Sequence, residues 1–404
     1  MMPLRAAVLG GALLLAPVLA QAQDKQESDI VVTGTPLDET DKALRDCLAR
    51  HCPPAEDIKA TLRHSENQFL HGDYRGSLGT LRQSGGRNRE YRKQVGPEFA
   101  DLMRATALVS RHLGEDQLYR VSTLSAQEVL ADTLPPNDPA RLTSQLEIGD
   151  MYGHVGRVAE AESNYRDVLG KAKAAGLADV TASARLRIVN LYILLAQSPA
   201  AASTYQRKAH AILADMAADP DPRAQRFLLA GKLMVARIAA DRGDEKEQNE
   251  ALAYYKAHAT TLNPVLISSK AADLREGRLS DTTSFSKSVN GADSRATQQL
   301  DGQWFDVSFW VKPDGRVESV DVLRKSKQLA GPWAKAVLDT IASRRYAPLP
   351  LPPLDPGVLR IERYTYTSPY RRITETRIMQ HSPHGRIEMI DLSNDAGDRP
   401  RPGG

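Results

Sequence analysis

The chain of 404 residues has little of what marks specialised protein classes. It has only two cysteines, which excludes a fold built on many disulfides or on cysteine-rich metal sites. Aromatic residues make up 5%, which argues against an all-β protein, and a net charge of +3 gives no strongly basic face for nucleic acid. After the N-terminal segment, no apolar run is long enough to cross a membrane. Apolar residues at 41% still allow a folded core.

Residues 1–22 have the features of a secretory signal peptide. Arg5 supplies the positive charge, Ala6 to Leu19 is almost wholly apolar, and Ala20-Gln21-Ala22 offers small residues for cleavage. We expect cleavage after Ala22, and cleavage after Ala20 also fits. The apolar stretch is shorter than the ~20 residues that span a bilayer, which favours cleavage over a retained anchor. The predicted location is the periplasm, and the alternative is the periplasmic side of the inner membrane.

Cys47 and Cys52 are predicted to form a disulfide, because an even cysteine count in an oxidising compartment favours pairing. Pro53 and Pro54 end the preceding helix near Cys52, so a closing turn is feasible. A redox role is the alternative, but redox pairs are usually Cys-x-x-Cys. We therefore interpret the pair as structural.

Residues 41–262 show apolar residues at helical spacing, interrupted by short breaks that contain Gly or Pro. Two stretches of this region match each other at a separation of 40 residues. The matched pairs are Tyr152 with Tyr192, Ala161 with Ala201, and Tyr165 with Tyr205. In this interpretation a large residue on one helix fills the space beside a small residue on the next. The pattern predicts a series of antiparallel helix pairs.

Gly149, Tyr152, Gly156, Ala161 and Tyr165 resemble the tetratricopeptide repeat in their spacing. The period is longer than the ~34 residues of that repeat, and the signature Trp is missing. The resemblance implies a degenerate repeat solenoid that presents a groove to protein partners, and a generic helical bundle is the alternative.

After a linker at 263–300, the periodicity changes from helix to strand. Trp304 to Val311 alternates apolar and polar residues as a half-buried strand does, and Val317 to Leu323 is the return strand. A helix is predicted from Trp333 to Arg344, followed by a third strand from Val358 to Tyr366. The predicted fold class is α+β, multidomain, with a helical solenoid followed by a small β-β-α-β domain at 301–370.

This domain resembles the TonB C-terminal domain. The match lies in the turn residues Asp314, Gly315 and Arg316 and in Arg345-Tyr346-Ala347-Pro348 after the helix. The resemblance implies capture of an extended peptide along a sheet edge. It places that edge on the third strand, where backbone atoms would bind the peptide, and the candidate edge residues are Leu359, Ile361, Arg363 and Thr365.

Three further segments are assigned. Residues 23–40 form a flexible leader, in which Asp29 to Gly34 resembles a TonB box. Two interpretations of this segment remain equal alternatives: it pairs with a TonB-type edge strand, or its β-propensity is due to chance. Residues 371–392 are a possible extra β-hairpin, built from Ile373 to Met379 and Arg386 to Leu392, and residues 393–404 are a disordered tail.

No hydrolase, zinc-protease or phosphate-loop motif is present, and His381 with His384 is a weak metal candidate. We therefore predict a non-enzymatic protein with no cofactor and no metal. It would bind other cell-envelope proteins by edge-strand pairing and would serve transmembrane transport. The candidate partners are TonB-dependent receptors or a TonB-type domain, and no nucleic-acid partner is expected. The alternative is a TonB-type energy transducer anchored by an uncleaved N-terminus. The missing Tyr-Pro before the first strand and the missing Pro-rich spacer argue against that alternative.

Overall fold

The structure is a computed structural model that describes residues 35–196, 198, 200–258, 263–269, 298–372, 379–382 and 385–393. The chain divides into two units, 1–35 and 36–404, and the second unit is the one described below. The predicted signal peptide, the segment Asp29 to Gly34 and residues 394–404 lie outside the described residues.

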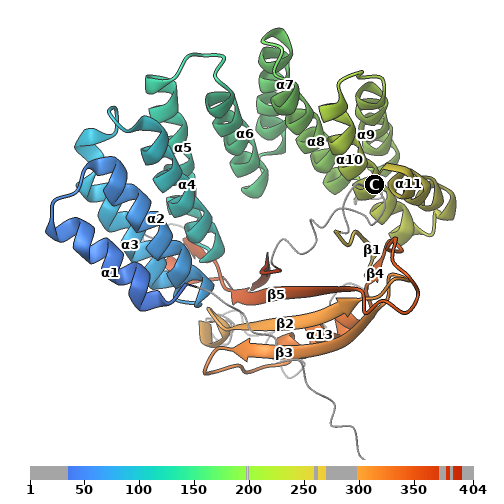
Figure 1. Cartoon of the computed structure of the whole chain (residues 1–404). Helices are drawn as coiled ribbons and strands as arrows, with labels where there is room; N and C mark the ends of the chain where they lie inside the picture. Colours follow the sequence, from blue (N-terminus) through green and yellow to red (C-terminus); the bar gives the residue numbers. More distant parts are fainter. Residues whose placement is uncertain are drawn as a thin grey trace, which may run out of the picture. The chain divides into compact units, whose positions relative to one another are not determined.

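The first part of this unit is a series of helices, each packed mainly against the helices next to it in the chain (Figure 1). A short 3-10 helix, Arg89–Tyr91, follows α3. The α-helices are α1 (Leu37–Ala49), α2 (Pro54–Leu70), α3 (Tyr74–Arg87), α4 (Gly96–His112), α5 (Asp116–Thr133), α6 (Pro139–His154), α7 (Val158–Ala174), α8 (Ala178–Leu195), α9 (Ala202–Ala217), α10 (Pro222–Arg242) and α11 (Glu245–His258).

Local sequence explains where these helices begin and end. Asp73 caps α3 by accepting a hydrogen bond from the Gly76 N–H, and Asp138 caps α6 through the Ala140 N–H. Gly72 and Gly114 take positive φ angles of 82° and 72° between paired helices, a conformation that L side chains rarely adopt. The predicted helical region is therefore present. It starts earlier than predicted, because α1 begins at Leu37 rather than after residue 40.

Cys47 and Cys52 form a disulfide with their Cα atoms 5.2 Å apart. The bond joins the end of α1 to the turn before α2, where the Cys52 N–H also donates to the Cys47 carbonyl. No helix among the described residues is both long and apolar enough to span a membrane.

The second part is a four-stranded antiparallel sheet in the order β3-β2-β5-β8. Its strands are β2 (Trp304–Val311), β3 (Val317–Lys325), β5 (Val358–Thr367) and β8 (Arg386–Asp391). Helix α13 (Trp333–Ala342) crosses between β3 and the short strand β4 (Arg345–Tyr346). Two small two-stranded sheets accompany it: β1 (Leu266–Ser268) with β4, and β6 (Tyr370–Arg372) with β7 (Met379–His381).

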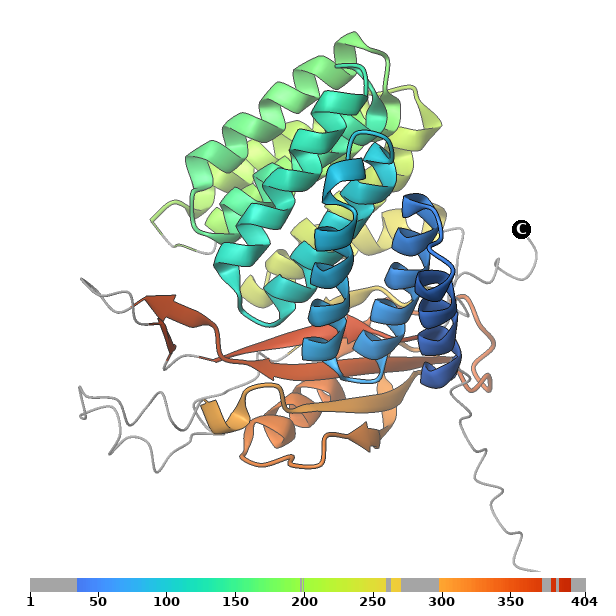
Figure 2. The same cartoon turned by 90° about the vertical axis from the view of Figure 1, so that its left-hand side faces the viewer.

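The two faces of the sheet are covered by different elements (Figure 2). On one face Phe305, Val307 and Phe309 pack with Trp333, Val337 and Ile341 of α13 into a buried core. On the other face the ends of α2, α3 and α4 contact β2 and β5: Tyr74 bonds Thr365, and Thr367 donates to the His112 carbonyl. The helical series and the sheet are thus joined by buried contacts.

The far end of the helical series also meets the C-terminal module. Tyr255 of α11, Ile267 of β1 and Ala347 after β4 form a small buried cluster. The Ala347 N–H donates to the Val265 carbonyl at 2.8 Å, and β1 pairs with β4. The module therefore contacts both the first and the last helices of the series.

Two predictions about strands are wrong. The strand Val358 to Tyr366 is not an open edge over most of its length, because β8 pairs with it over Glu362–Thr367 while β2 pairs along its other side. No described strand pairs with residues 358–360 on the β8 side. Because β8 pairs with β5, Arg386 to Leu392 does not form a hairpin with the segment before His381. Instead, Met379–His381 pairs with Tyr370–Arg372. Residues 373–378 lie outside the described residues.

Candidate functional site

The predicted repeat contacts between α6 and α7 are present in the structure. A Cβ atom on Gly149 would clash with the Tyr165 ring, so this glycine allows the ring to lie against α6. The Tyr165 hydroxyl donates to Asp150 at 2.7 Å, and Ala161 is fully buried. Gly156 has a φ of 78° between the two helices. Arg187 of α8 reaches the same Asp150 at 3.0 Å, which links the next helix.

The 40-residue match does not hold through the second helix of the pair. Helix α7 begins at Val158 and α9 at Ala202, so their equivalent positions are 44 residues apart. Ala161 is then equivalent to Tyr205, and Tyr165 to the buried Ala209. Ala201 lies before α9 and is partly exposed.

The aromatic residues of this region still meet. The Tyr192 and Tyr205 rings lie 5.6 Å apart, and the partly buried Tyr152 packs beside this core.

The turn between β2 and β3 contacts the segment after α13. Gly315 has a φ of 81°, and a side chain there would clash with the Tyr346 carbonyl. The Tyr346 N–H donates to the Gly315 carbonyl at 2.8 Å, and the Arg316 N–H donates to Asp314 at 3.0 Å. The two sequence stretches that resemble the TonB C-terminal domain therefore meet in space.

A buried ion pair lies where the sheet meets the helices. Arg363 and Asp306 are both fully buried and share two hydrogen bonds, of 2.5 and 2.9 Å. Arg324 on β3 also donates to Asp306, at 2.8 Å. The Arg363 guanidinium stacks over the Trp304 ring at 4.0 Å and donates to the Phe69 carbonyl at the end of α2. Arg363 was predicted to belong to an open, peptide-binding edge strand, but its side chain is buried and bonds to Asp306 and to the Phe69 carbonyl of α2.

His112 at the end of α4 is part of the same contact. Its ring packs against Phe69 and Tyr74, and its Nε2 has no hydrogen-bond partner among the described residues. Burial and then the nearby charges of Arg386, Arg363 and Arg111 lower the pKa of His112 to about 3. The ring is therefore neutral at physiological pH.

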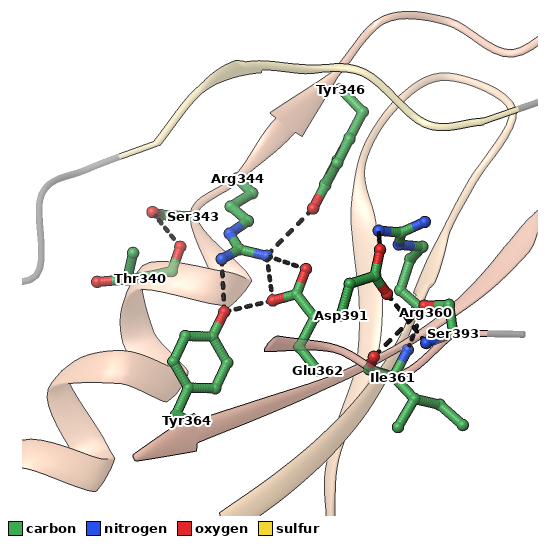
Figure 3. Close-up of polar contacts among 10 residues, drawn as sticks. All are labelled: Thr340, Ser343, Arg344, Tyr346, Arg360, Ile361, Glu362, Tyr364, Asp391 and Ser393. Atoms are coloured by element: carbon green, nitrogen blue, oxygen red, sulfur yellow. Dashed lines mark hydrogen bonds and ion pairs between the residues drawn. The ribbon is translucent and has the colours of Figure 1, made fainter. Parts of the chain in front are cut away.

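A second buried cluster joins the end of α13 to β5 (Figure 3). Arg344 donates to Glu362 at 2.8 and 3.0 Å, to the Tyr346 hydroxyl at 3.2 Å and to the Tyr364 hydroxyl at 2.6 Å. Asp391 of β8 pairs with Arg360, which lies on β5 like Glu362 and Tyr364. The Arg344 and Glu362 side chains are only 10% and 5% exposed, whereas Asp391 is partly open to solvent. We interpret the buried part of the cluster as structural.

The outer border of the sheet is β8. The Leu392 N–H donates to the Ile361 carbonyl, so the alternate residues Arg386, Glu388 and Ile390 bond to β5. Ile387, Met389 and Asp391 then direct their backbone N–H and C=O groups away from β5. No described strand lies beyond β8, and the residue Met389 is 52% exposed. The strand β3 at the opposite border carries two irregularities of register and several charges, which protect an edge from pairing.

Sequence reasoning missed Asp306, Arg344 and Glu362, and it missed that β8 pairs with β5. The available signal was the placement of opposite charges on neighbouring strands, since Asp306 and Arg363 become direct partners once the two strands are aligned. Leu359, Ile361 and Thr365 lie on the inner strand β5. No group of three or more metal-binding side chains occurs within the described ranges, and His384 lies outside them.

The sequence matches no protein-family model and no curated protein. Among solved structures, a kinesin light chain protein from Podosopora anserina with nearly identical TPR-like repeats is 20% identical, with a TM-score of 0.38 over 51% of this chain and 95% of that one.

BtubC (BKLC) from P. vanneervenii is 15% identical, with a TM-score of 0.42 over 55% of this chain and 91% of that one. The Rap conjugation gene regulator of the plasmid pLS20, in complex with the Phr* peptide, is 15% identical, with a TM-score of 0.36 over 69% and 62% of the two chains. At these low scores the likeness carries no information on function.

Proposed function

We propose that this chain is an exported, non-catalytic scaffold of the cell envelope that binds an extended segment of a partner protein along the outer border of β8. The observation that carries the proposal is that successive residues of β8 direct their backbone groups alternately towards β5 and away from it. Ile387, Met389 and Asp391 direct backbone groups away from β5, at an edge of the sheet where no other described strand pairs with β8. An extended peptide can add to such a border by backbone hydrogen bonds, whatever its exact sequence.

The surroundings of this border indicate which segments fit. Met389 lies beside Tyr364 on the α13 face of the sheet, and about half of the residue's surface is exposed. An apolar residue of the partner opposite Met389 would cover that surface, at roughly 25 cal/mol per Å² of apolar area removed from water. We therefore expect β-prone segments with alternating apolar residues, of the kind found in transport proteins of the outer membrane.

Export is supported by the signal-like N-terminus and by the Cys47–Cys52 disulfide, which is typical of oxidising compartments. N-terminal sequencing of the protein from its native cells tests this part. A chain that begins near Gln23 supports a periplasmic scaffold. A chain that begins at Met1 or Met2 in the membrane fraction supports an anchored transducer instead.

Backbone recognition is tested by a pair of substitutions at one position. Met389→Pro removes an N–H that points away from β5, so it blocks an added strand and leaves the bonds between β5 and β8 in place. Met389→Ala removes only the side chain. With a photo-crosslinking residue at Asp391, the wild-type and Met389→Ala proteins should capture the partner, and the Met389→Pro protein should not. Equal capture by all three would contradict edge pairing.

A further inference from the structure

A cleft lies where the helices meet the C-terminal module, apart from the border of β8. It consists of two cavities, of about 480 and about 470 Å³, and Tyr370 lines both. One cavity is bounded by the start of α5, and the other by residues 298–302 and the turn before α3. Clefts at the junction of two structural parts are common ligand sites.

The inner cavity is polar and holds a largely buried carboxylate. The Asp301 side chain is only 13% exposed, and its Oδ1 accepts a hydrogen bond from the Ser368 N–H at 2.8 Å. Its Oδ2 lies 3.7 Å from Arg75, which is too long for a hydrogen bond. Burial raises the pKa of Asp301, and the Ser368 N–H, His381 and Arg75 oppose this shift only in part. Among the described residues, no lysine or arginine donates a hydrogen bond to this carboxylate.

His381 adds a second polar group to this cavity. It is 8% exposed, and its ring lies 4.1 Å from that of Tyr370. Its Nδ1 is 2.9 Å from the Ser368 carbonyl, an atom that can only accept, so Nδ1 carries the proton. In the neutral ring Nε2 is then an acceptor, and no hydrogen bond to it is found among the described residues.

The outer cavity combines an apolar wall with more carboxylates. Leu118 and Val121 of α5 form the wall, and Val121 is 56% exposed. Glu115 and Asp116 lie beside them, and Glu115 is 4.0 Å from Arg75. Among the described residues that line the two cavities, carboxylates outnumber guanidinium groups: Asp73, Glu115, Asp116 and Asp301 against Arg75 and Arg82, with His381 as a further basic side chain.

From this arrangement we infer that the cleft binds an organic cation on an aliphatic stem. The ammonium or guanidinium group would lie between Asp301 and Glu115, where it would displace the Arg75 side chain, and the stem would lie along Leu118 and Val121. The Arg75 side chain is 62% exposed and makes no contact with either acid shorter than 3.7 Å, so it can move aside. A lysine or arginine side chain of a polypeptide and a free diamine share this chemistry.

Calorimetric titration of the whole mature protein tests the inference with three probes: cadaverine, N-acetyl-lysine methylamide and N-acetyl-glutamate methylamide. Both cations, or the lysine derivative alone, should bind, and the glutamate derivative should not. Binding of the lysine derivative alone indicates a polypeptide source, and binding of cadaverine as well admits a free diamine. No heat from either cation at millimolar concentration would overturn the inference.

Two substitutions sharpen the result. Asp301→Asn keeps an oxygen for the Ser368 N–H and removes the charge, so it should weaken cation binding at least tenfold. Arg75→Gln removes the competing cation and should tighten binding several-fold. Weaker binding by Arg75→Gln would overturn the inference. Asp215→Asn, on the exposed side of α9, is the matched control and should bind the cations like the wild type. Met389→Pro should also leave cation binding in the cleft unchanged. The proposed cleft site and the proposed β8 border can therefore be disproved independently.

Discussion

Arg363 and Asp306 form an ion pair in which neither side chain is exposed to solvent, on neighbouring strands of a sheet that is covered on both faces. Arg363 also donates to the Phe69 carbonyl at 3.2 Å, so this one guanidinium connects β5, β2 and the end of α2. Through the Phe69 carbonyl, the pair adds to the other buried contacts between the helices and the C-terminal module. Because a buried charge that loses its partner is costly, we expect the pair to favour this arrangement of the two parts.

Removing one member of this pair should destabilise the protein strongly. Arg363→Met should lower the free energy of unfolding by about 3 kcal/mol, because it leaves Asp306 buried with only the half-exposed Arg324. The double variant Asp306→Leu/Arg363→Met should recover much of this loss. Urea unfolding measures both. Arg324→Met is the control and should cost about 1 kcal/mol or less. Equal losses for the three variants would contradict this account of the pair.

Gly72 and Gly156 provide a matched test of the contact between helices and sheet. Both have φ angles near 80°, but a Cβ atom on Gly72 would clash with the Trp304 ring, whereas that on Gly156 meets open space. Gly156→Ala should cost about 1 kcal/mol from backbone strain alone. Gly72→Ala should lower the free energy of unfolding by about 2 kcal/mol or more. It should also expose Trp304, so that solvent quenches its fluorescence more strongly. Equal thermal stability of the two variants would show that Trp304 does not pack on this turn.

The stability of the protein should depend on His112 below neutral pH. Its pKa is about 3 when folded and near 6.5 when unfolded, so above pH 6.5 the ring is neutral in both states. As the pH falls from 6.5 towards 3, the unfolded chain binds a proton that the folded chain does not. The free energy of unfolding should then fall by about 1.4 kcal/mol per pH unit from this group.

The variant His112→Phe removes this dependence and keeps the carbonyl that accepts from Thr367. Urea unfolding at pH 7 and pH 5 should show a loss for the wild type that is about 2 kcal/mol larger than for the variant. The same loss in both proteins would mean that His112 is accessible to protons in the folded state.

The disulfide should contribute modestly to stability because it closes a short loop. The double variant Cys47→Ser/Cys52→Ser should lower the free energy of unfolding by about 2 kcal/mol. The melting temperature of the wild type in the presence of a reducing agent should fall to that of the double variant. A redox role would appear instead as disulfide exchange with glutathione at a catalytic rate.

Much of the fold was predictable because its signals are local. The glycines and caps between helices, the apolar spacing within helices and the turn Pro313-Asp314-Gly315 act over a few residues. The strand β8 was assigned to the wrong partner, because strand pairing across about twenty residues is decided by tertiary contacts. Arg386 reaches the Arg111 carbonyl of α4, and no local pattern shows this.

The alternation in Trp304 to Val311 predicted a strand with one face in solvent. In the structure Asp306 and Ser308 are buried, because α2, α3 and α4 cover that face. A polar residue on a strand indicates solvent only when nothing packs over it. The 40-residue match failed in a similar way, because the connection before α9 is longer than the one before α7.

Hydrogen exchange of the mature protein, with and without its captured partner, tests the central claim most directly. The amides of Ile387, Met389 and Asp391 should exchange rapidly in the free protein and be protected in the complex. The amides of Glu388 and Ile390, which already bond to β5, should change little. Protection confined to the helices, or unchanged exchange along β8, would contradict binding at this border.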